Sequence, residues 1–253
     1  MLFQKKEKIS LPEIIDIHSH VLPGIDDGSR HHDMTMHMLE IAVSEGITTI
    51  VATPHHMPGK GYTPPDKIRE MVTQLQIEAD NADMGIRILP GNELFYREDL
   101  LDLLEEGQVM GMNGTDYVLV EFDVMADRPY IRNAMRNILS LGYKPILAHV
   151  ERYPAILGKD YETIRILRKL GVLIQANAAS ITGEVGKDTQ KHMKKLLKEG
   201  LIDLVGTDAH TDRNRAPRMQ ECIKVLEKWC EPEYVQALVW KNASELLGDE
   251  KSI

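Results

Sequence analysis

The sequence reads Ile14-Ile15-Asp16-Ile17-His18-Ser19-His20 near its beginning, an apolar run that ends in two histidines. In a strand, the side chains of residues i and i+2 point to the same side. His18 and His20 can therefore reach one common point at the end of a predicted strand. The same arrangement, a short apolar run followed by a side chain that binds metals, returns several times along the chain and indicates both a fold and a site.

Short β-branched runs alternate with segments of helical periodicity, which predicts parallel βα units. We expect seven strands, at residues 14–18, 48–53, 86–90, 117–121, 145–149, 172–177 and 204–207. We expect helices at residues 34–45, 65–81, 130–141, 161–170, 189–199 and 219–229. A glycine stands between five of the predicted helices and the next strand, where a helix C-cap often needs positive φ. Seven or eight such units often close into a barrel with its chemistry at the carboxyl ends of the strands.

The composition fits one folded domain. A length of 253 residues is normal for a single α/β barrel, and 43% hydrophobic residues suffice for its core. The net charge of -9 gives no general basic footprint for nucleic acid. No apolar run approaches the roughly 20 residues of a membrane span. Cys222 and Cys230 do not suggest a disulfide framework, so we expect a reducing cytoplasm.

Metal-binding residue types follow almost every predicted strand except the sixth. They are His18, His20, His55 or His56, Glu93, Glu121, His149, Asp208 and His210. Each one alone has an ordinary explanation as a surface histidine, a rim carboxylate or a polar turn, and Asp26-Asp27-Gly28 reads as a turn. Together they predict a metal site. Imidazoles mixed with several carboxylates suit manganese, iron or zinc and favour more than one ion. A carboxylate such as Glu93 can bridge two ions about 3.5–4 Å apart.

Two arginines stand a few residues beyond these candidate ligands: Arg152 follows His149, and Arg215 follows His210. A guanidinium binds phosphate oxygens through two parallel hydrogen bonds. A solvated loop arginine is the alternative, which we prefer for Arg213. The two downstream arginines predict that the metal site acts on a phosphate group.

Other catalytic motifs are missing from the sequence. Neither cysteine is followed by an arginine at the spacing of a cysteine phosphatase loop, and no G-x-S-x-G motif occurs. Gly186-Lys187 lacks the Ser or Thr of a phosphate-binding Walker A loop. Gly59-Lys60-Gly61 lacks the third glycine of a dinucleotide-binding fingerprint.

At its motifs the chain resembles the polymerase and histidinol phosphatase (PHP) superfamily, and within it the bacterial manganese-dependent tyrosine-protein phosphatases of the CpsB/CapC/YwqE type. The resemblance runs from about residue 15 to residue 247. The motifs that carry it are Asp16-Ile-His-Ser-His20, Asp26-Asp-Gly28, Ala52-Thr-Pro-His-His56, Gly91-Asn-Glu93, Leu119-Val-Glu-Phe122, Ala148-His-Val-Glu-Arg-Tyr153 and Thr207-Asp-Ala-His210.

The resemblance implies a fold, a site and an activity. The fold would be an α/β, TIM-like distorted (β/α)7 barrel of the PHP type. Up to three divalent ions, Mn²⁺ with iron or zinc as alternatives, would be ligated by His18, His20, Asp27, His55, Glu93, Glu121, His149, Asp208 and His210. Arg152 and Arg215 would be the catalytic residues that bind the phosphate. The expected reaction is attack of a metal-bridging hydroxide on phosphotyrosine. The implied target is the Tyr-rich tail of a bacterial tyrosine kinase that controls capsular or exopolysaccharide synthesis.

Residues 14–253 then form one phosphatase domain, and residues 1–13 form an N-terminal extension, because similar proteins often begin close to the first strand. Two alternatives stay open: another PHP phosphoesterase, such as a histidinol phosphatase or a nuclease, and a catalytically silent regulator that binds the kinase. An amidohydrolase usually has a carboxylated lysine ligand, and no lysine ends a predicted strand.

Overall fold

The computed structural model describes residues 11–57, 59–158 and 160–248, so the expected N-terminal extension lies outside the described residues up to residue 10. The strands are β1 (Ile15–Ser19), β2 (Thr49–Ala52), β3 (His55–Met57), β4 (Gly61–Tyr62), β5 (Arg87–Pro90), β6 (Glu93–Phe95), β7 (Tyr117–Glu121), β8 (Lys144–Leu147), β9 (Leu173–Asn177) and β10 (Leu204–Gly206). The α-helices are α1 (His32–Ser44), α2 (Pro65–Asn81), α3 (Leu100–Glu105), α4 (Arg128–Ser140), α5 (Glu162–Lys169), α6 (Ala178–Thr182), α7 (Lys187–Lys198), α8 (Gln220–Trp229), α9 (Pro232–Gln236) and α10 (Asn242–Leu246). Shorter helical turns are η1 (Met112–Gly114), η2 (Val150–Arg152) and η3 (Ala237–Lys241).

The expected distorted barrel is confirmed, and its distortion has a local cause. β2 and β5 match predicted strands, and each is followed by a short strand that was not predicted: β3 after a break at Thr53-Pro54, and β6 after a break at Gly91-Asn92. β2 pairs with β5, and β3 pairs with β6, so the two broken strands remain neighbours on both sides of the bend. The strands form two sheets, β1-β2-β5 and β10-β9-β8-β7-β6-β3-β4, in which β4 alone is antiparallel to its neighbour.

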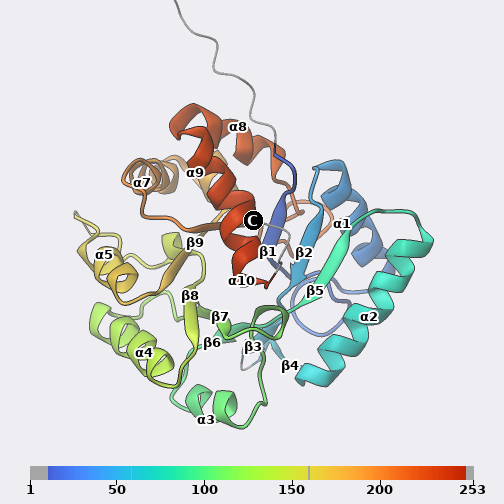
Figure 1. Ribbon diagram of the computed structural model, residues 1–253, viewed down its shortest axis with the longest axis horizontal. Coiled ribbons are helices and arrows are strands. Elements are labelled where there is room, and N and C mark those ends of the chain that lie inside the picture. The colour runs from blue at the N-terminus through green and yellow to red at the C-terminus, as the bar shows by residue number, and fades with distance from the viewer. Residues whose placement is uncertain (1–10, 58, 159, 249–253) are drawn as a thin grey trace, which may run out of the picture.

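The barrel closes between its first and last strands. Ser19 and Ala209 form a parallel bridge beyond the ends of β1 and β10. The Asp208 amide donates to the carbonyl of His18 at 2.8 Å, and the His20 amide donates to the carbonyl of Ala209 at 2.8 Å. Figure 1 shows the resulting ring of strands with helices around its outside. Because of this closure, residues that are 190 positions apart along the chain lie side by side, as Asp208 does with His18.

The six predicted helices are present as α1, α2, α4, α5, α7 and α8, and their ends lie within two residues of the expected ones. α4 begins earlier than expected because Asp127 accepts a hydrogen bond from the amide of Tyr130 at 2.8 Å and thereby caps the helix. The helices that were not predicted have six residues or fewer, which is too short for a periodic pattern. The five glycines expected after helices all have positive φ: Gly46, Gly85, Gly142, Gly171 and Gly200.

Two apolar clusters surround the strands, one inside the barrel and one between the strands and the outer helices. Inside the barrel, Ile15 and Ile17 of β1 pack with inward side chains of β2, β7, β8 and β10. Ala243 and Leu246 of α10 belong to this cluster, and Figure 1 shows α10 crossing the middle of the ring. The larger cluster fills the space between the strands and the outer helices. With one end of the barrel filled by apolar side chains, buried polar residues gather at the other end. None of the described helices is both long and apolar enough to cross a membrane.

Candidate metal centre

The nine expected ligands all lie at the carboxyl ends of the barrel strands, at the bends, or in the loops that follow. Eight of them are at most 6% exposed, and Asp27 has a side chain that is 42% exposed. Three groups of these residues present ligand atoms within 4.8 Å of one another: His20, Asp27, His55 and His210; His18, His20 and Asp208; His55, Glu93 and Glu121. His149 lies outside these groups but contacts Glu93. The structure thus brings together every residue that the resemblance indicated.

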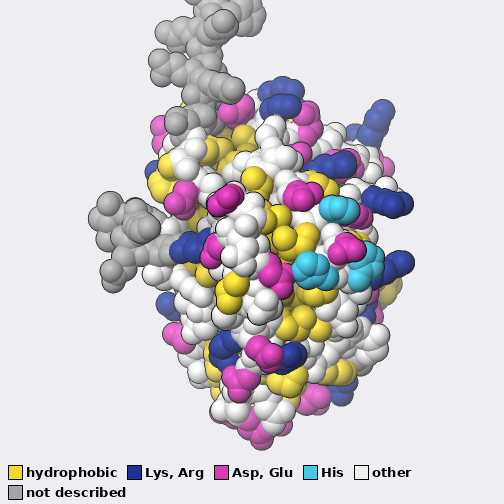
Figure 2. All heavy atoms as spheres, turned by 90° about the vertical axis from the view of Figure 1, so that its right-hand side faces the viewer, with side chains coloured by type: hydrophobic (Ala, Val, Ile, Leu, Met, Phe, Trp, Pro, Cys, Tyr) yellow, Lys and Arg dark blue, Asp and Glu magenta, His cyan; other side chains and the backbone are white. Residues whose placement is uncertain are grey.

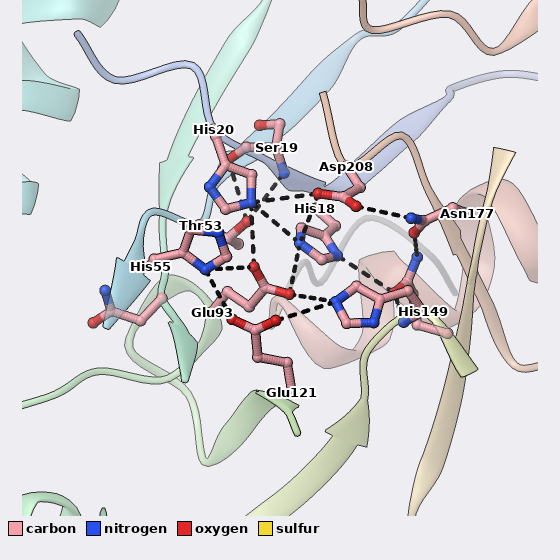
Figure 3. A network of polar contacts seen from close by, with 12 residues as sticks. His18, Ser19, His20, Thr53, His55, Glu93, Glu121, His149, Asn177 and Asp208 are labelled. Carbon is pink, nitrogen blue, oxygen red and sulfur yellow. Dashed lines mark hydrogen bonds and ion pairs between the residues drawn. The ribbon is translucent and has the colours of Figure 1, made fainter. Parts of the chain in front are cut away.

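Glu93 lies at the centre of the cluster, as Figure 3 shows. Its Oε1 is 3.2 Å from Nε2 of His18 and 2.7 Å from Nε2 of His149. Its Oε2 is 3.3 Å from Nε2 of His20 and 2.9 Å from Nδ1 of His55. Each oxygen therefore faces a different pair of imidazoles, which is the arrangement that a carboxylate needs in order to bridge two ions.

The other carboxylates lie around Glu93. Oε1 of Glu121 is 2.9 Å from Nδ1 of His55. Oδ1 of Asp208 is 3.5 Å from Nε2 of His20. Oδ1 of Asp27 is 3.2 Å from Nε2 of His55 and 3.4 Å from Nε2 of His210. Asp27 is thus part of the site although its sequence context reads as a turn.

Four of the clustered histidines have a hydrogen-bond partner on Nδ1, while Nε2 of each lies near a carboxylate oxygen of the cluster. The pairs are His20 Nδ1 with Asp26 Oδ2 at 2.8 Å, His149 Nδ1 with the Tyr153 hydroxyl at 3.3 Å, His18 Nδ1 with Gln175 Oε1 at 3.4 Å, and His210 Nδ1 with the Asp208 carbonyl at 3.0 Å. Such partners orient the imidazole rings of metal ligands. Sequence reasoning assigned no role to Asp26, Tyr153 or Gln175. Asp26 and Tyr153 lie inside the motifs that carry the resemblance. Gln175 could have been noticed as a polar residue in the middle of the apolar run of β9.

The cluster holds more negative charge than neutral imidazoles can balance. Burial lowers the pKa of His55, but the nearby carboxylates of Asp27, Glu121 and Glu93 outweigh this effect and raise the pKa to about 10. Burial also lowers the pKa of His149, but the carboxylates of Glu121 and Glu93 outweigh this effect and raise the pKa to about 9. The buried carboxylates therefore attract positive charge strongly, and divalent ions would satisfy the same demand.

Unpaired buried atoms at the site also fit metal ions. Glu93 Oε2, Glu121 Oε1, Asp208 Oδ1 and His55 Nδ1 are buried and face one another or neighbouring imidazoles without forming a hydrogen bond with the described residues. A buried polar atom without a partner is costly, so a native fold rarely keeps several together without a use for them. Carboxylate oxygens and imidazole nitrogens are ligands for manganese, iron and zinc. The residues present fit bound divalent ions.

Two of the nine residues have an unusual backbone conformation. His149 has φ of 32° and Asp208 has φ of 54°, both in the left-handed region. Each follows a strand, His149 after β8 and Asp208 shortly after β10, where the chain turns sharply. Backbone strain of this kind concentrates at functional sites, where the surrounding structure maintains it.

Both expected arginines reach the cluster through one residue. Nη2 of Arg152 contacts Oδ2 of Asp208, and Nη2 of Arg215 is 2.9 Å from the same oxygen. The two arginines and Asp208 line a cavity of about 260 Å³ beside the cluster. Arg213, by contrast, has a side chain that is 87% exposed, as expected for a solvated loop arginine.

Lys60 is a further cation that sequence reasoning did not assign to the site. Its Nζ lies 2.9 Å from Oδ2 of Asp27 and 3.4 Å from Nε2 of His55. The residue belongs to the Gly59-Lys60-Gly61 segment, whose sequence gives no sign of a metal site.

Several other reactive side chains lie outside the cluster. His56, next to His55 in β3, packs against the ring of Tyr62 with centroids 4.8 Å apart, and burial lowers its pKa. The alternative between His55 and His56 is therefore resolved in favour of His55. Among the exposed histidines of α1, His32 pairs with Glu78 of α2 at 2.5 Å. Figure 2 shows several histidines among acidic and basic side chains on one face of the molecule. Cys222 and Cys230 are buried and form no disulfide.

Comparison with known proteins gives three kinds of match. The family model for capsular polysaccharide synthesis proteins, CpsB/CapC, matches residues 14–248. The tyrosine-protein phosphatase CpsB of Streptococcus agalactiae serotype V is 31% identical over 239 residues, which cover 92% of this chain and 98% of the relative. A solved structure from work on YwqE of Bacillus subtilis and CpsB of Streptococcus pneumoniae, described as unique metal-dependent tyrosine phosphatases, is 32% identical with a TM-score of 0.85. That match covers 95% of this chain and 96% of the other.

A more distant likeness concerns the fold alone. The histidinol phosphate phosphatase of Lactococcus lactis, solved with zinc, histidinol and phosphate, is 16% identical with a TM-score of 0.55. The match covers 85% of this chain and 93% of the other. It agrees with the PHP-type barrel described above.

Proposed function

The chain belongs to the CpsB/CapC family of capsular polysaccharide synthesis, and we propose that it is a metal-dependent phosphatase that hydrolyses phosphotyrosine in proteins. The observation that carries the proposal is that Arg152 and Arg215 both pair with Asp208 of the nine-residue cluster and line a cavity beside it. Metal ligands alone suit many hydrolases. Two guanidinium groups beside them favour a substrate with a phosphate group.

Manganese is the ion that we propose, with up to three ions per chain. Three overlapping groups of ligand atoms support that number, and the mixture of imidazoles and carboxylates supports that type of ion. Bound ions would supply positive charge for the phosphate oxygens and a water activated as the nucleophile. The family relationship supports the choice because a similar solved structure is described as a metal-dependent tyrosine phosphatase.

The residues of the chain then have distinct tasks. Asp208 holds both guanidinium groups at the edge of the cavity, so that Arg152 and Arg215 bind equatorial oxygens of the phosphate. These arginines stabilise the charge that grows on those oxygens in the transition state. A phenolate leaves more readily than an alkoxide, since phenols have a pKa of about 10. A strong general acid is therefore less necessary.

The substrate that we propose is the phosphorylated tail of a bacterial tyrosine kinase that regulates capsule or exopolysaccharide synthesis. The name of the family links the chain to capsular polysaccharide synthesis, and the relatives are named tyrosine-protein phosphatases. We place the reaction in the cytoplasm, a choice supported by two buried cysteines that form no disulfide.

A substrate panel tests the proposal. The protein, loaded with Mn²⁺, is given a phosphotyrosine peptide, histidinol phosphate and an oligonucleotide under the same conditions. We expect turnover of the peptide by far the fastest. Turnover of only the other two would favour another PHP phosphoesterase, and tight binding of the kinase without turnover of any phosphoester would indicate a silent regulator.

A further inference from the structure

The strand β9 supplies none of the nine candidate ligands, yet it carries two buried amide side chains. Gln175 is fully buried and Asn177 is 6% exposed. As residues i and i+2 of one strand, both point to the same side. A buried amide is costly unless its donors and acceptors are paired, so the partners of these two side chains reveal what they do.

The orientation of the Gln175 amide is dictated by its neighbours. The backbone amide of His149 donates to Oε1 of Gln175 at 2.6 Å, and a backbone N–H can only donate. The same oxygen lies 3.4 Å from Nδ1 of His18. An accepting oxygen at this place keeps the proton of His18 on Nδ1, so that Nε2 presents its lone pair to the cluster. Gly206 leaves the room for this arrangement, because a Cβ there would lie 2.8 Å from Cβ of His18 and 3.3 Å from Nε2 of Gln175.

The orientation of Asn177 follows from that of Gln175. Nε2 of Gln175 donates to Oδ1 of Asn177 at 2.9 Å, which leaves Nδ2 of Asn177 to donate to Oδ2 of Asp208 at 2.9 Å. The backbone of Asn177 is also held, because its amide donates to Oε1 of Glu151 at 3.0 Å. Figure 3 shows Asn177 beside Asp208, on the side of that carboxylate away from His20. The second oxygen of Asp208, Oδ1, stays directed at the cluster without a hydrogen bond.

We propose that Gln175 and Asn177 are positioning residues that together hold His18, His149 and Asp208 ready to bind divalent ions. The three residues come from β1, the turn after β8 and the segment after β10, and the two amides of β9 connect them. The proposal rests on the proposed metal-dependent function. It explains why the strand without a ligand carries polar residues at two inward positions.

The test measures Mn²⁺ affinity directly, by titration of the metal-stripped protein against a chelating indicator, together with the melting temperature of the metal-free protein. The variants are Gln175→Met, which keeps the volume and removes the amide, Asn177→Ala, and the double variant. The matched control is Gln190→Met, since Gln190 donates to the carbonyls of Ile181 and Thr182 and contacts none of the nine ligands. We expect each single variant to weaken Mn²⁺ binding about 10–100-fold, as losses of such outer partners do. The double variant should weaken it by less than the product of the two, because the amides act through each other.

The proposal would be overturned if the Gln175 and Asn177 variants melted at a lower temperature but bound Mn²⁺ within about twofold of the unchanged protein. The two amides would then have a purely structural role. The Gln190→Met control should show that pattern. If Gln175→Met does not fold, Asn177→Ala at the less buried position still decides. The proposed function fails separately: the unchanged protein would then bind Mn²⁺ without hydrolysing phosphotyrosine, while the affinity comparison would still decide the positioning role.

Discussion

Replacing Arg152 with alanine should slow catalysis strongly and leave the metal centre intact. Arg152 contacts the cluster through Asp208 alone, and Asp208 keeps Nη2 of Arg215 at 2.9 Å and Nδ2 of Asn177 at 2.9 Å. The buried carboxylate therefore stays paired, and Mn²⁺ content should not change. The phosphate loses one transition-state donor, which typically reduces kcat about 10²–10³-fold, or about 2.7–4 kcal/mol.

The assay is steady-state hydrolysis of a phosphotyrosine peptide, with metal content measured on the same samples. Arg213→Ala is the matched control, because Arg213 lies in the same loop as Arg215 and its side chain is 87% exposed. That control should keep kcat within about twofold of the unchanged protein, as surface changes usually do. An unchanged kcat in Arg152→Ala would refute the role of Arg152. A fall in kcat that matches a fall in Mn²⁺ content would show that the arginine supports the metal centre instead.

Chelation of the metal should abolish activity, and added Mn²⁺ should restore it. When the free Mn²⁺ concentration is about 1,000 times Kd, binding should add about 4 kcal/mol to the free energy of unfolding. For a domain of this size that corresponds to a melting temperature roughly 8–16 °C higher, and equal values with and without Mn²⁺ would contradict the metal centre. Iodoacetamide should not inactivate the enzyme, because Cys222 and Cys230 are at most 6% exposed and burial raises the pKa of the Cys222 thiol. Rapid inactivation would argue for a cysteine mechanism. Gly206→Ala should cost about 1–3 kcal/mol through overpacking against His18 and should weaken Mn²⁺ binding, as measured by denaturant unfolding and metal titration. Gly158→Ala is its control, since a Cβ there meets only the flexible end of Arg128, and equal losses in both variants would count against the close packing at Gly206.

Much of the barrel and its site could be predicted because both follow from local patterns. Parallel strands place their carboxyl ends together, so residues such as His18, Glu121 and His149 mark the site by their position after apolar runs. Asp27 could not be recognised in this way, because Asp-Gly is an ordinary turn dipeptide, and it was assigned only by the resemblance.

What could not be predicted depends on contacts between distant segments. Gln175 and Asn177 have a role only because β10 pairs with β9 and because the barrel closes onto β1. Asp208 and His18 thereby come beside β9, although His18 lies more than 150 residues away in the sequence. Lys60 reaches Asp27 through the fold of the β3–β4 hairpin, which has no signature in local periodicity. The short strands β3 and β6, which follow the breaks at Pro54 and Asn92, were not predicted because three residues are too few for a periodic pattern.

The left-handed backbone at His149 and Asp208 makes thermal stability and activity compete at these positions. Glycine adopts this conformation without the steric cost that other residues bear, and Asn is among the residues that tolerate it best. His149→Gly would therefore relax the backbone in the metal-free protein, while removing a candidate ligand. Selection for heat resistance alone would favour such replacements, and only selection for turnover would retain the original residues. Laboratory evolution of this enzyme for thermal endurance should consequently include an activity screen, or the most robust survivors will be inactive.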